Sequence, residues 1–300
     1  MDKARIGAFA ERVFGDIAGF MTIGMAYLGA KTGLFRAMAG KGPLTISQVA
    51  DLSRLQPRYV EEWLKGLVTT GYIEYEPESE TFTLPDEHAY LLASEGTDHF
   101  IGGLFYQAVG MNAVAPQVAE AFRNGGGVPF DAFGEDFLIG LDLANQGMYE
   151  QRFVSYWLQT LPAVVAKLEE GGSALDVGCG AGRVSMALAR DFPKARCVGL
   201  DLDAVSIEQA RRAATEAGLA ERVEFVHGPL AGLDTGERYD LITCCDCVHE
   251  FAEPVETLRQ IRERLADDGT LFVIEPRVAD RLEDNCNPIA TMFYGFSTFH

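Results

Sequence analysis

The feature that most constrains the fold is an alternation of short apolar runs and helical segments that begins at Ser173. Five strand-like runs read ALDVG, RCVGLDLD, VEFVHG, YDLITCCD and GTLFVIEP. Helices are predicted between them over residues 183–192, 204–218 and 254–269. Buried strands that alternate with helices predict a parallel, Rossmann-like α/β sheet covered on both faces. Ligands of such sheets bind beyond the carboxyl ends of the strands.

A glycine-rich turn follows the first of these runs. The stretch SALDVGCGAGRV places Asp176 ahead of Gly178, Gly180 and Gly182. Glycine permits positive φ and a close approach of ligand to backbone, and the helix after the turn offers unpaired N–H groups. A dinucleotide fingerprint needs a glycine at the sixth position, where this chain has Arg183, and a Walker phosphate loop needs a Gly-Lys-Ser/Thr that is absent. The turn therefore predicts a nucleotide site of another kind.

A carboxylate follows the second run. Asp201 stands 23 residues after Gly178, at the place where an acid can accept hydrogen bonds from both hydroxyls of a ribose. The alternative is that Asp201 or Asp203 only caps the next helix. Asp203 suits the cap better because it directly precedes AVSIEQARRA, which leaves Asp201 for a ligand.

With these residues in place, the segment 173–276 resembles the class I S-adenosylmethionine-dependent methyltransferases. LDVGCGAG resembles their first motif, GLDLD their second, and DDGTLFVIEP the strand that closes the cofactor half. The resemblance implies that the three glycines admit the methionine and ribose parts of the cofactor, that Asp201 binds the ribose and that Leu202 packs on the adenine. Where the family often has Gly-Asp after the third strand, this chain has Gly-Pro. The predicted cofactor-binding residues are Asp176, Gly178, Gly180, Gly182, Asp201, Leu202, Pro229, Leu230 and Asp246.

The fourth run ends in CCDCVHEFAEP, and its histidine resembles the His-Asp segment of small-molecule O-methyltransferases, including plant phenolic and hydroxyindole enzymes. The resemblance implies that His249 is the catalytic general base on an acceptor hydroxyl. The alternative is a histidine that only packs or caps. Cys244 and Cys247 have the spacing of a metal knuckle, but no second pair exists, so buried structural cysteines and no metal site are predicted.

Residues 26–96 predict a winged helix, because two helical segments are followed by the hairpin pattern YIEYEPESETFTLP. The same order of domains occurs in the O-methyltransferases named above and in bacterial winged-helix methyltransferases. This region holds six basic and ten acidic residues, and the whole chain has a formal charge of −19. A phosphate-contacting surface has the opposite sign, so dimerisation or closure of a substrate pocket is predicted and nucleic-acid binding is not.

Residues 97–170 predict a helical linker or lid, broken by NGGGVPFDAF. Phe130 and Phe133 are predicted to contact a small substrate, and the alternative is a plain connector. The longest uncharged run, 17–30, has 14 residues and is shorter than the ~20 that span a bilayer, so it predicts a buried or subunit-interface helix. The cysteines lack the spacing of a secreted framework and no signal peptide is evident, which predicts a cytoplasmic protein.

The sequence thus predicts a mainly α winged-helix domain over 1–96, the linker over 97–170 and a methyltransferase domain over 171–300. The last domain is expected to lack the final strands of its fold, since only 24 residues follow Pro276. The predicted function is S-adenosyl-L-methionine-dependent methylation of a small molecule at a hydroxyl, by a homodimer. Two rivals stay open: a winged-helix regulator or scaffold that binds the same cofactor without catalysis, and an NAD-dependent oxidoreductase.

Overall fold

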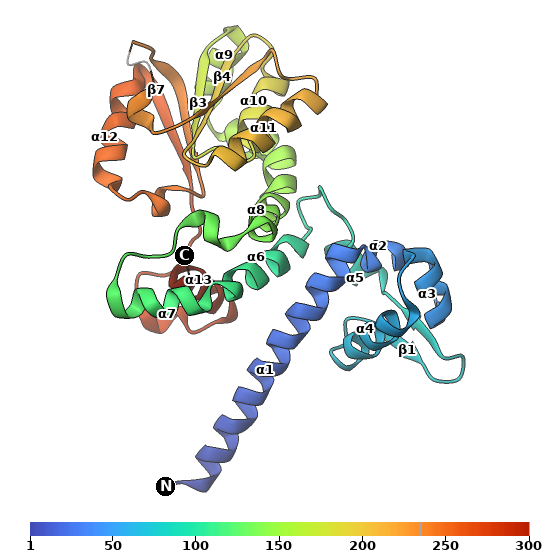
Figure 1. Ribbon diagram of the computed structural model, residues 1–300. Helices are drawn as coiled ribbons and strands as arrows, with labels where there is room; N and C mark the ends of the chain where they lie inside the picture. The colour runs from blue at the N-terminus through green and yellow to red at the C-terminus, as the bar shows by residue number, and fades with distance from the viewer. Residues whose placement is uncertain (234–235, 300) are drawn as a thin grey trace. The chain divides into compact units, whose positions relative to one another are not determined.

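The computed structural model describes residues 1–233 and 236–299, and the chain divides into two compact units, Met1–Asn145 and Gln146–Thr298. Figure 1 labels their helices and strands. The predicted linker, 97–170, contributes residues to both units. Each unit has its own buried core.

The first unit contains the predicted winged helix. A capping box begins α3: the Thr45 hydroxyl accepts from the Gln48 N–H, and the Gln48 side chain accepts from the Thr45 N–H at 2.8 Å. Pro57 occupies the first turn of α4, where its missing N–H costs nothing. The predicted order of helix, turn, helix and hairpin is confirmed. The elements are α2 (Leu34–Met38), α3 (Ile46–Ser53), α4 (Pro57–Thr69), β1 (Glu74–Glu76), β2 (Thr81–Thr83) and α5 (Asp86–Leu92).

The rest of the first unit is helical and includes a close helix crossing. A Cβ on Gly103 would lie 2.6 Å from the Gly140 carbonyl oxygen, so only glycine allows α6 and α8 to approach this closely. The buried Gln107 side chain donates to the same oxygen at 3.2 Å. The elements are α6 (Gly102–Ala113), α7 (Ala115–Asn124), the 3-10 turn η1 (Phe130–Phe133) and α8 (Glu135–Met148).

Helix α1 (Lys3–Thr32) precedes the winged helix and buries only part of its length. Its buried residues, Thr22, Ala26, Gly29 and Ala30, all lie in its C-terminal half. By length and composition α1 would suffice to cross a membrane, a test that a helix packed against protein also passes. Large apolar side chains are exposed along the helix, all but Leu28 before Thr22: Ile6, Phe9, Val13, Phe14, Ile17, Phe20, Met21 and Leu28.

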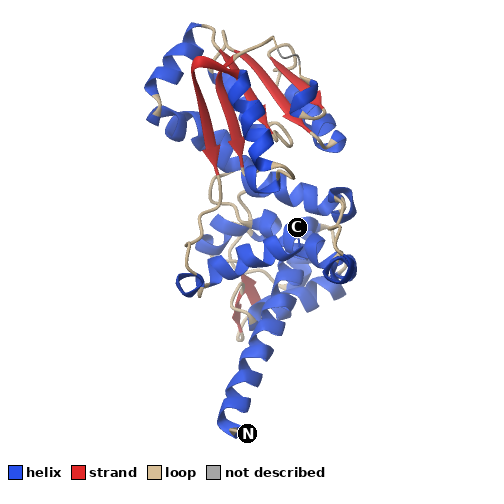
Figure 2. Ribbon diagram, turned by 90° about the vertical axis from the view of Figure 1, so that its left-hand side faces the viewer, coloured by secondary structure: helices blue, strands red, loops and turns tan. Residues whose placement is uncertain are grey.

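The second unit contains the predicted parallel sheet, with the strand order β5-β4-β3-β6-β7 and helices on both faces (Figure 2). Within this sheet β3 is the first strand along the sequence. The next two strands, β4 and β5, lie on one side of it, and β6 and β7 lie on the other side. Loops that leave β3 and β6 therefore run in opposite directions, and ligands of such sheets bind beyond the carboxyl ends of the strands at this point. The strands are β3 (Ser173–Val177), β4 (Arg196–Asp201), β5 (Val223–His227), β6 (Tyr239–Cys245) and β7 (Leu265–Ile274).

Short helical elements surround this sheet. The π-helix η2 (Tyr149–Trp157), the 3-10 turn η3 (Leu158–Thr160) and α9 (Pro162–Glu170) precede it. Two longer helices, α10 (Arg183–Asp191) and α11 (Ala204–Glu216), begin where the sequence predicts. Beyond the strands lie the 3-10 turns η4 (Leu230–Gly232), η5 (Val248–Glu250) and η6 (Leu282–Asn285), and the helices α12 (Pro254–Arg264) and α13 (Pro288–Phe299).

The predicted end of α12 is wrong. The helix stops at Arg264, not at Gly269, because Leu265 already pairs with Tyr239 in the sheet. A register shift near the start of β6 takes up the intervening residues, and a Cβ on Gly269 would lie 2.7 Å from the Tyr239 carbonyl oxygen. After β7, the described residues 276–299 form turns and α13, with no strand among them.

Candidate active site

The three glycines of the turn after β3 serve two different purposes. All have positive φ, at 70° for Gly178, 51° for Gly180 and 78° for Gly182. A Cβ on Gly178 would lie 2.8 Å from the Cβ of Cys247, and one on Gly182 would lie 2.5 Å from the Phe225 ring. No atom lies within 4 Å of a Cβ on Gly180. Two glycines are thus needed for packing, and Gly180 leaves the open space that a ligand could use.

Asp201 ends β4 and joins this turn. One carboxylate oxygen accepts from the Gly180 N–H at 2.8 Å, and the other accepts from the Asp203 N–H at 2.8 Å. Burial raises the pKa of Asp201. Each oxygen can accept a second hydrogen bond, so the group keeps capacity for ligand hydroxyls. The predicted cap is confirmed: the Asp203 side chain accepts from the Ser206 N–H at 2.7 Å and begins α11.

An exposed leucine stands beside this carboxylate. Leu202 is 72% exposed, and its carbonyl oxygen lies 3.0 Å from Nε2 of His227. Leu230, which follows Pro229 in η4, is buried. An open glycine, a carboxylate with free acceptor capacity and an uncovered apolar side chain together match the needs of a nucleoside: room, a ribose partner and a base surface. These residues fit an S-adenosyl cofactor.

Asp176 lies beneath the turn instead of facing the open space. It is 2% exposed, and its oxygens accept from the Ser185 hydroxyl at 2.7 Å and the Thr243 hydroxyl at 2.6 Å. Burial raises its pKa to about 6, against the opposing effect of the two hydroxyls. Asp176 ties β3 to α10 and β6, so its placement indicates a support for the turn and not a ligand contact.

His249 lies in η5, directly after β6. Its Nδ1 is 2.5 Å from a Glu275 oxygen and its Nε2 is 3.1 Å from a Glu250 oxygen. The second Glu275 oxygen accepts from the Val248 N–H at 2.7 Å, which fixes that carboxylate in place. Hydrogen bonds to Glu250 and Glu275 raise the pKa of His249 to about 9.

Glu275 is the site residue that the sequence reasoning missed. It follows β7, and β7 pairs with β6, so the parallel register brings the two strand ends together. The sequence did contain an indication of this residue. Glu275 stands next to the end of the run GTLFVIEP, and the carboxyl end of that strand lies at the same sheet edge as CCDCVHE.

The predicted cofactor residue Asp246 stands at the same edge, with an unusual positive φ of 58°. Its N–H donates to the Ile274 carbonyl oxygen at 2.8 Å, which holds this conformation. Ligand atoms of Asp246, His249 and Glu275 lie within 4.8 Å of one another. A divalent cation could bind to such a set of ligand atoms, but it would have to displace the imidazole from the Glu275 oxygen that His249 now contacts.

The cysteines around the site are structural. Cys244, Cys245 and Cys247 are buried, as predicted, and the Cys247 thiol donates to the Val177 carbonyl oxygen at 3.1 Å. All six cysteines of the chain are free thiols.

The two predicted substrate residues belong to the first unit and differ in exposure. Phe133 is 4% exposed and packs on Phe137, with ring centroids 4.8 Å apart. Phe130 is 36% exposed. Phe133 is therefore a core residue, and of this pair only Phe130 presents substantial surface.

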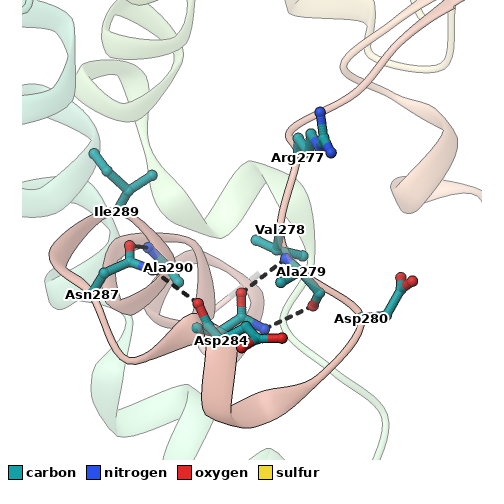
Figure 3. A pocket seen from close by; sticks show the side chains of 9 residues that line it. Arg277, Val278, Ala279, Asp280, Asp284, Asn287, Ile289 and Ala290 are labelled. Carbon is teal, nitrogen blue, oxygen red and sulfur yellow. Dashed lines mark hydrogen bonds between the residues drawn. The ribbon is translucent and has the colours of Figure 1, made fainter.

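A pocket of about 530 Å³ lies in the segment that follows Glu275 (Figure 3). The buried Asn285 holds the segment closed: its amide accepts from the Ala279 N–H at 2.9 Å and donates to the Ala279 carbonyl oxygen at 2.8 Å. A pocket of this size suits a small molecule. Its lining includes Arg277, Val278, Asp280, Asp284, Asn287 and Ile289.

Two family descriptions match the chain. Residues 168–296 match a methyltransferase domain, and residues 20–94 match an Rv2258c-like winged HTH domain. The ubiquinone biosynthesis O-methyltransferase of Actinobacillus pleuropneumoniae is 33% identical over 108 residues, which cover 34% of this chain and 44% of that protein. This chain thus matches less than half of the length of that curated relative.

Solved structures resemble the chain over nearly its full length. Mitomycin 7-O-methyltransferase MmcR has a TM-score of 0.69 at 19% identity and covers 99% of this chain and 87% of its own. Human N-acetylserotonin methyltransferase, solved with S-adenosylmethionine, has a TM-score of 0.67 at 19% identity, with coverage of 100% and 86%. At this identity the likeness establishes the fold. The chain therefore carries an S-adenosyl-L-methionine-dependent methyltransferase domain behind a winged-helix domain, on the fold of these O-methyltransferases.

Proposed function

We propose that this protein transfers a methyl group from S-adenosyl-L-methionine to a hydroxyl of a small molecule. The observation that carries the proposal is the placement of His249 and Glu275 at the same edge of one sheet as Gly180 and Asp201. The end of this edge with Gly180 and Asp201 fits a nucleoside, and the end with His249 offers a general base. The O-methyltransferase names of the relatives support the same acceptor chemistry.

When bound, the cofactor supplies a methyl group on a sulfonium, whose departing thioether needs no proton. The protein mainly has to position the acceptor, a contribution of several kcal/mol in well-aligned reactions. Gly180 would give room for the cofactor, Asp201 would accept hydrogen bonds from its ribose hydroxyls and Leu202 would cover its adenine. Once His249 has lost the proton that bonds Nε2 to Glu250, this nitrogen would remove the acceptor proton, while its Nδ1–H stays bonded to Glu275, which fixes the ring.

The Gly180→Ala variant tests the cofactor site. A methyl group there would fill the open space, so we expect affinity for S-adenosylhomocysteine to fall roughly 10- to 100-fold, measured by calorimetry. Gly218→Ala is the matched control, because Gly218 also has positive φ, at 68°, and nothing within 4 Å of its Cβ. Both variants should lose about 1–2 kcal/mol of stability, from backbone strain alone. Equal affinity of the two variants would place the cofactor elsewhere.

The acceptor class is tested with matched pairs of small phenols and anilines and a cofactor that carries a labelled methyl group. We expect label in the ether product of the phenols and little in the anilines. Transfer to the anilines alone would reject the hydroxyl assignment. Cofactor binding without transfer to any small acceptor, together with a DNA gel shift at physiological salt, would favour the regulator.

We further propose that a second copy of the chain covers the exposed apolar face of α1. The charges on this part of the helix are antisymmetric, with Arg5 and Arg12 set against Glu11 and Asp16. Antiparallel pairing about the middle of that stretch would bring Arg5 opposite Asp16 and Arg12 within two residues of Glu11. Four charges within residues 5–16 oppose burial in lipid, which is costly for each ion.

A double substitution, Phe9→Glu with Phe14→Glu, should convert a dimer to a monomer in light scattering, because it places two carboxylates in the apolar face. Phe122→Glu, at an exposed phenylalanine on α7, should leave the dimer intact. A monomeric wild type, or co-sedimentation of α1 with lipid vesicles, would contradict this proposal.

The free thiols and the acidic surface support a cytoplasmic protein without nucleic-acid partners as a further part of the proposal.

A further inference from the structure

One ion pair beside the glycine turn has no part in the function proposed so far. Arg183 is the first residue of α10, directly after Gly182, and it donates to a Glu150 oxygen at 2.6 Å. Both side chains are partly buried, at 19% and 28% exposure. Glu150 belongs to the π-helix η2, whose backbone also accepts from Arg190 at 3.1 Å. π-helical segments are rare and are frequent at functional sites.

Arg183 is in an unfavourable position for a purely structural cation. The N-terminus of a helix carries partial positive charge, so an arginine in the first turn is disfavoured. Side chains of a helix lean toward its N-terminus, which here is the glycine turn. A guanidinium that a partly buried carboxylate holds beside this turn indicates that its positive charge binds an anionic group of a ligand.

The other charged residues at this sheet edge indicate which group of a ligand Arg183 binds. In the residues that directly follow β3, β4, β5 and β6, which are 178–183, 202–204, 228–233 and 246–253, Arg183 is the one arginine or lysine; Arg277 follows β7, the edge strand, which lies two strands from the glycine turn of β3. The same stretches carry Asp203, Asp246, Glu250 and Glu253. The amino-acid end of an S-adenosyl cofactor has an ammonium and a carboxylate. Its ammonium has several acidic partners available, whereas Arg183 is the permanent cation that directly follows the glycine turn.

We infer that Arg183 binds the carboxylate of the cofactor's amino-acid end, with Glu150 holding the guanidinium in place for it. This inference rests on the proposed function. The fork of an arginine matches a carboxylate with two parallel hydrogen bonds, so the arginine can bind one carboxylate and keep a contact to another. Arg183 is then a specificity residue that distinguishes complete cofactor from nucleosides that lack the amino acid.

Calorimetry of the full chain with two ligands tests this inference. S-adenosylhomocysteine has the carboxylate, and 5′-methylthioadenosine has the same nucleoside without the amino-acid end. Arg183→Met should weaken S-adenosylhomocysteine binding about 10- to 100-fold and change 5′-methylthioadenosine binding less than about twofold. Arg183→Lys keeps the charge without the fork and should fall between the wild type and Arg183→Met.

Arg190→Met is the matched control, since Arg190 also bonds η2 from α10 but lies a further two turns from the glycine turn. It should affect both ligands alike and only slightly. Equal weakening of both ligands by Arg183→Met, or no weakening of either, would overturn the inference. Asp201→Asn should weaken both ligands, because both contain the ribose. A wild-type chain that binds neither ligand would overturn the proposed function, and the inference with it.

Discussion

The His249→Ala variant is expected to lower turnover about 10²- to 10⁴-fold and to leave affinity for S-adenosylhomocysteine nearly unchanged. The imidazole removes the acceptor proton in the proposed mechanism but does not contact the nucleoside side of the site. Single-turnover methyl transfer and calorimetry measure the two quantities separately. Unchanged turnover would reduce His249 to a packing or capping residue, and a parallel loss of affinity would mean that it supports the cofactor.

The role of His249 as general base also predicts the direction in which turnover changes with pH. Glu250 and Glu275 raise the pKa of His249 to about 9, so the free imidazole is mostly protonated at neutral pH. Turnover should therefore rise with pH between 7 and 9, as the base form accumulates.

Two conservative variants separate charge from orientation at this histidine. Glu250→Gln and Glu275→Gln should both move the rise in turnover to lower pH, because each removes a carboxylate that favours the imidazolium. Only Glu275→Gln should also lower the plateau at high pH, since Glu275 fixes the ring through Nδ1. Identical profiles for the two variants would remove the orienting role of Glu275.

The Asp176→Asn variant is expected to change how stability depends on pH. Burial raises the pKa of Asp176 to about 6, above an unfolded value of ~3.9. The unfolded chain therefore loses this proton first, and the contribution of Asp176 to stability is full below pH 4 and is lost as pH rises through 6. The difference corresponds to roughly 3 kcal/mol at one carboxyl group.

Urea unfolding between pH 4 and 8 measures this effect, followed by the fluorescence of Trp157 in a Trp63→Phe background. The stability of Asp176→Asn relative to the parent should rise by about 3 kcal/mol across this range. Thr243→Val removes a hydroxyl that favours the ionised form, so it should raise the pKa of Asp176 further and extend the decline in stability to higher pH. A difference that stays flat with pH would show that the buried carboxyl keeps an ordinary acidity.

Local patterns predicted most of the second unit because each of them has a local physical cause. The starts of α10, α11 and α12 follow from a glycine turn, an aspartate cap and a proline in the first turn. The end of α12 was mispredicted because strand pairing of Leu265, a long-range contact, overrides the helical pattern. Glu275 was missed for the same reason, since its role depends on the neighbouring strand.

The site residues illustrate the same limit. Asp201 and its neighbour Asp203 were assigned different roles from their positions relative to a helix start, and the cap at Asp203 is confirmed. Asp176 belongs to the same motif, but no pattern in the sequence reveals that its carboxylate turns inward to Ser185 and Thr243. Burial depends on residues that are 9 and 67 positions away.

The hydrogen bond from the Gly180 N–H to Asp201 joins the tips of two adjacent strands without any ligand. The proposed ribose partner is thus already held in place in the empty protein, and little loop entropy would be lost on association. Hydrogen exchange at the Gly180 amide should accordingly be slow in the empty protein. Binding of the nucleoside should require little rearrangement of the backbone.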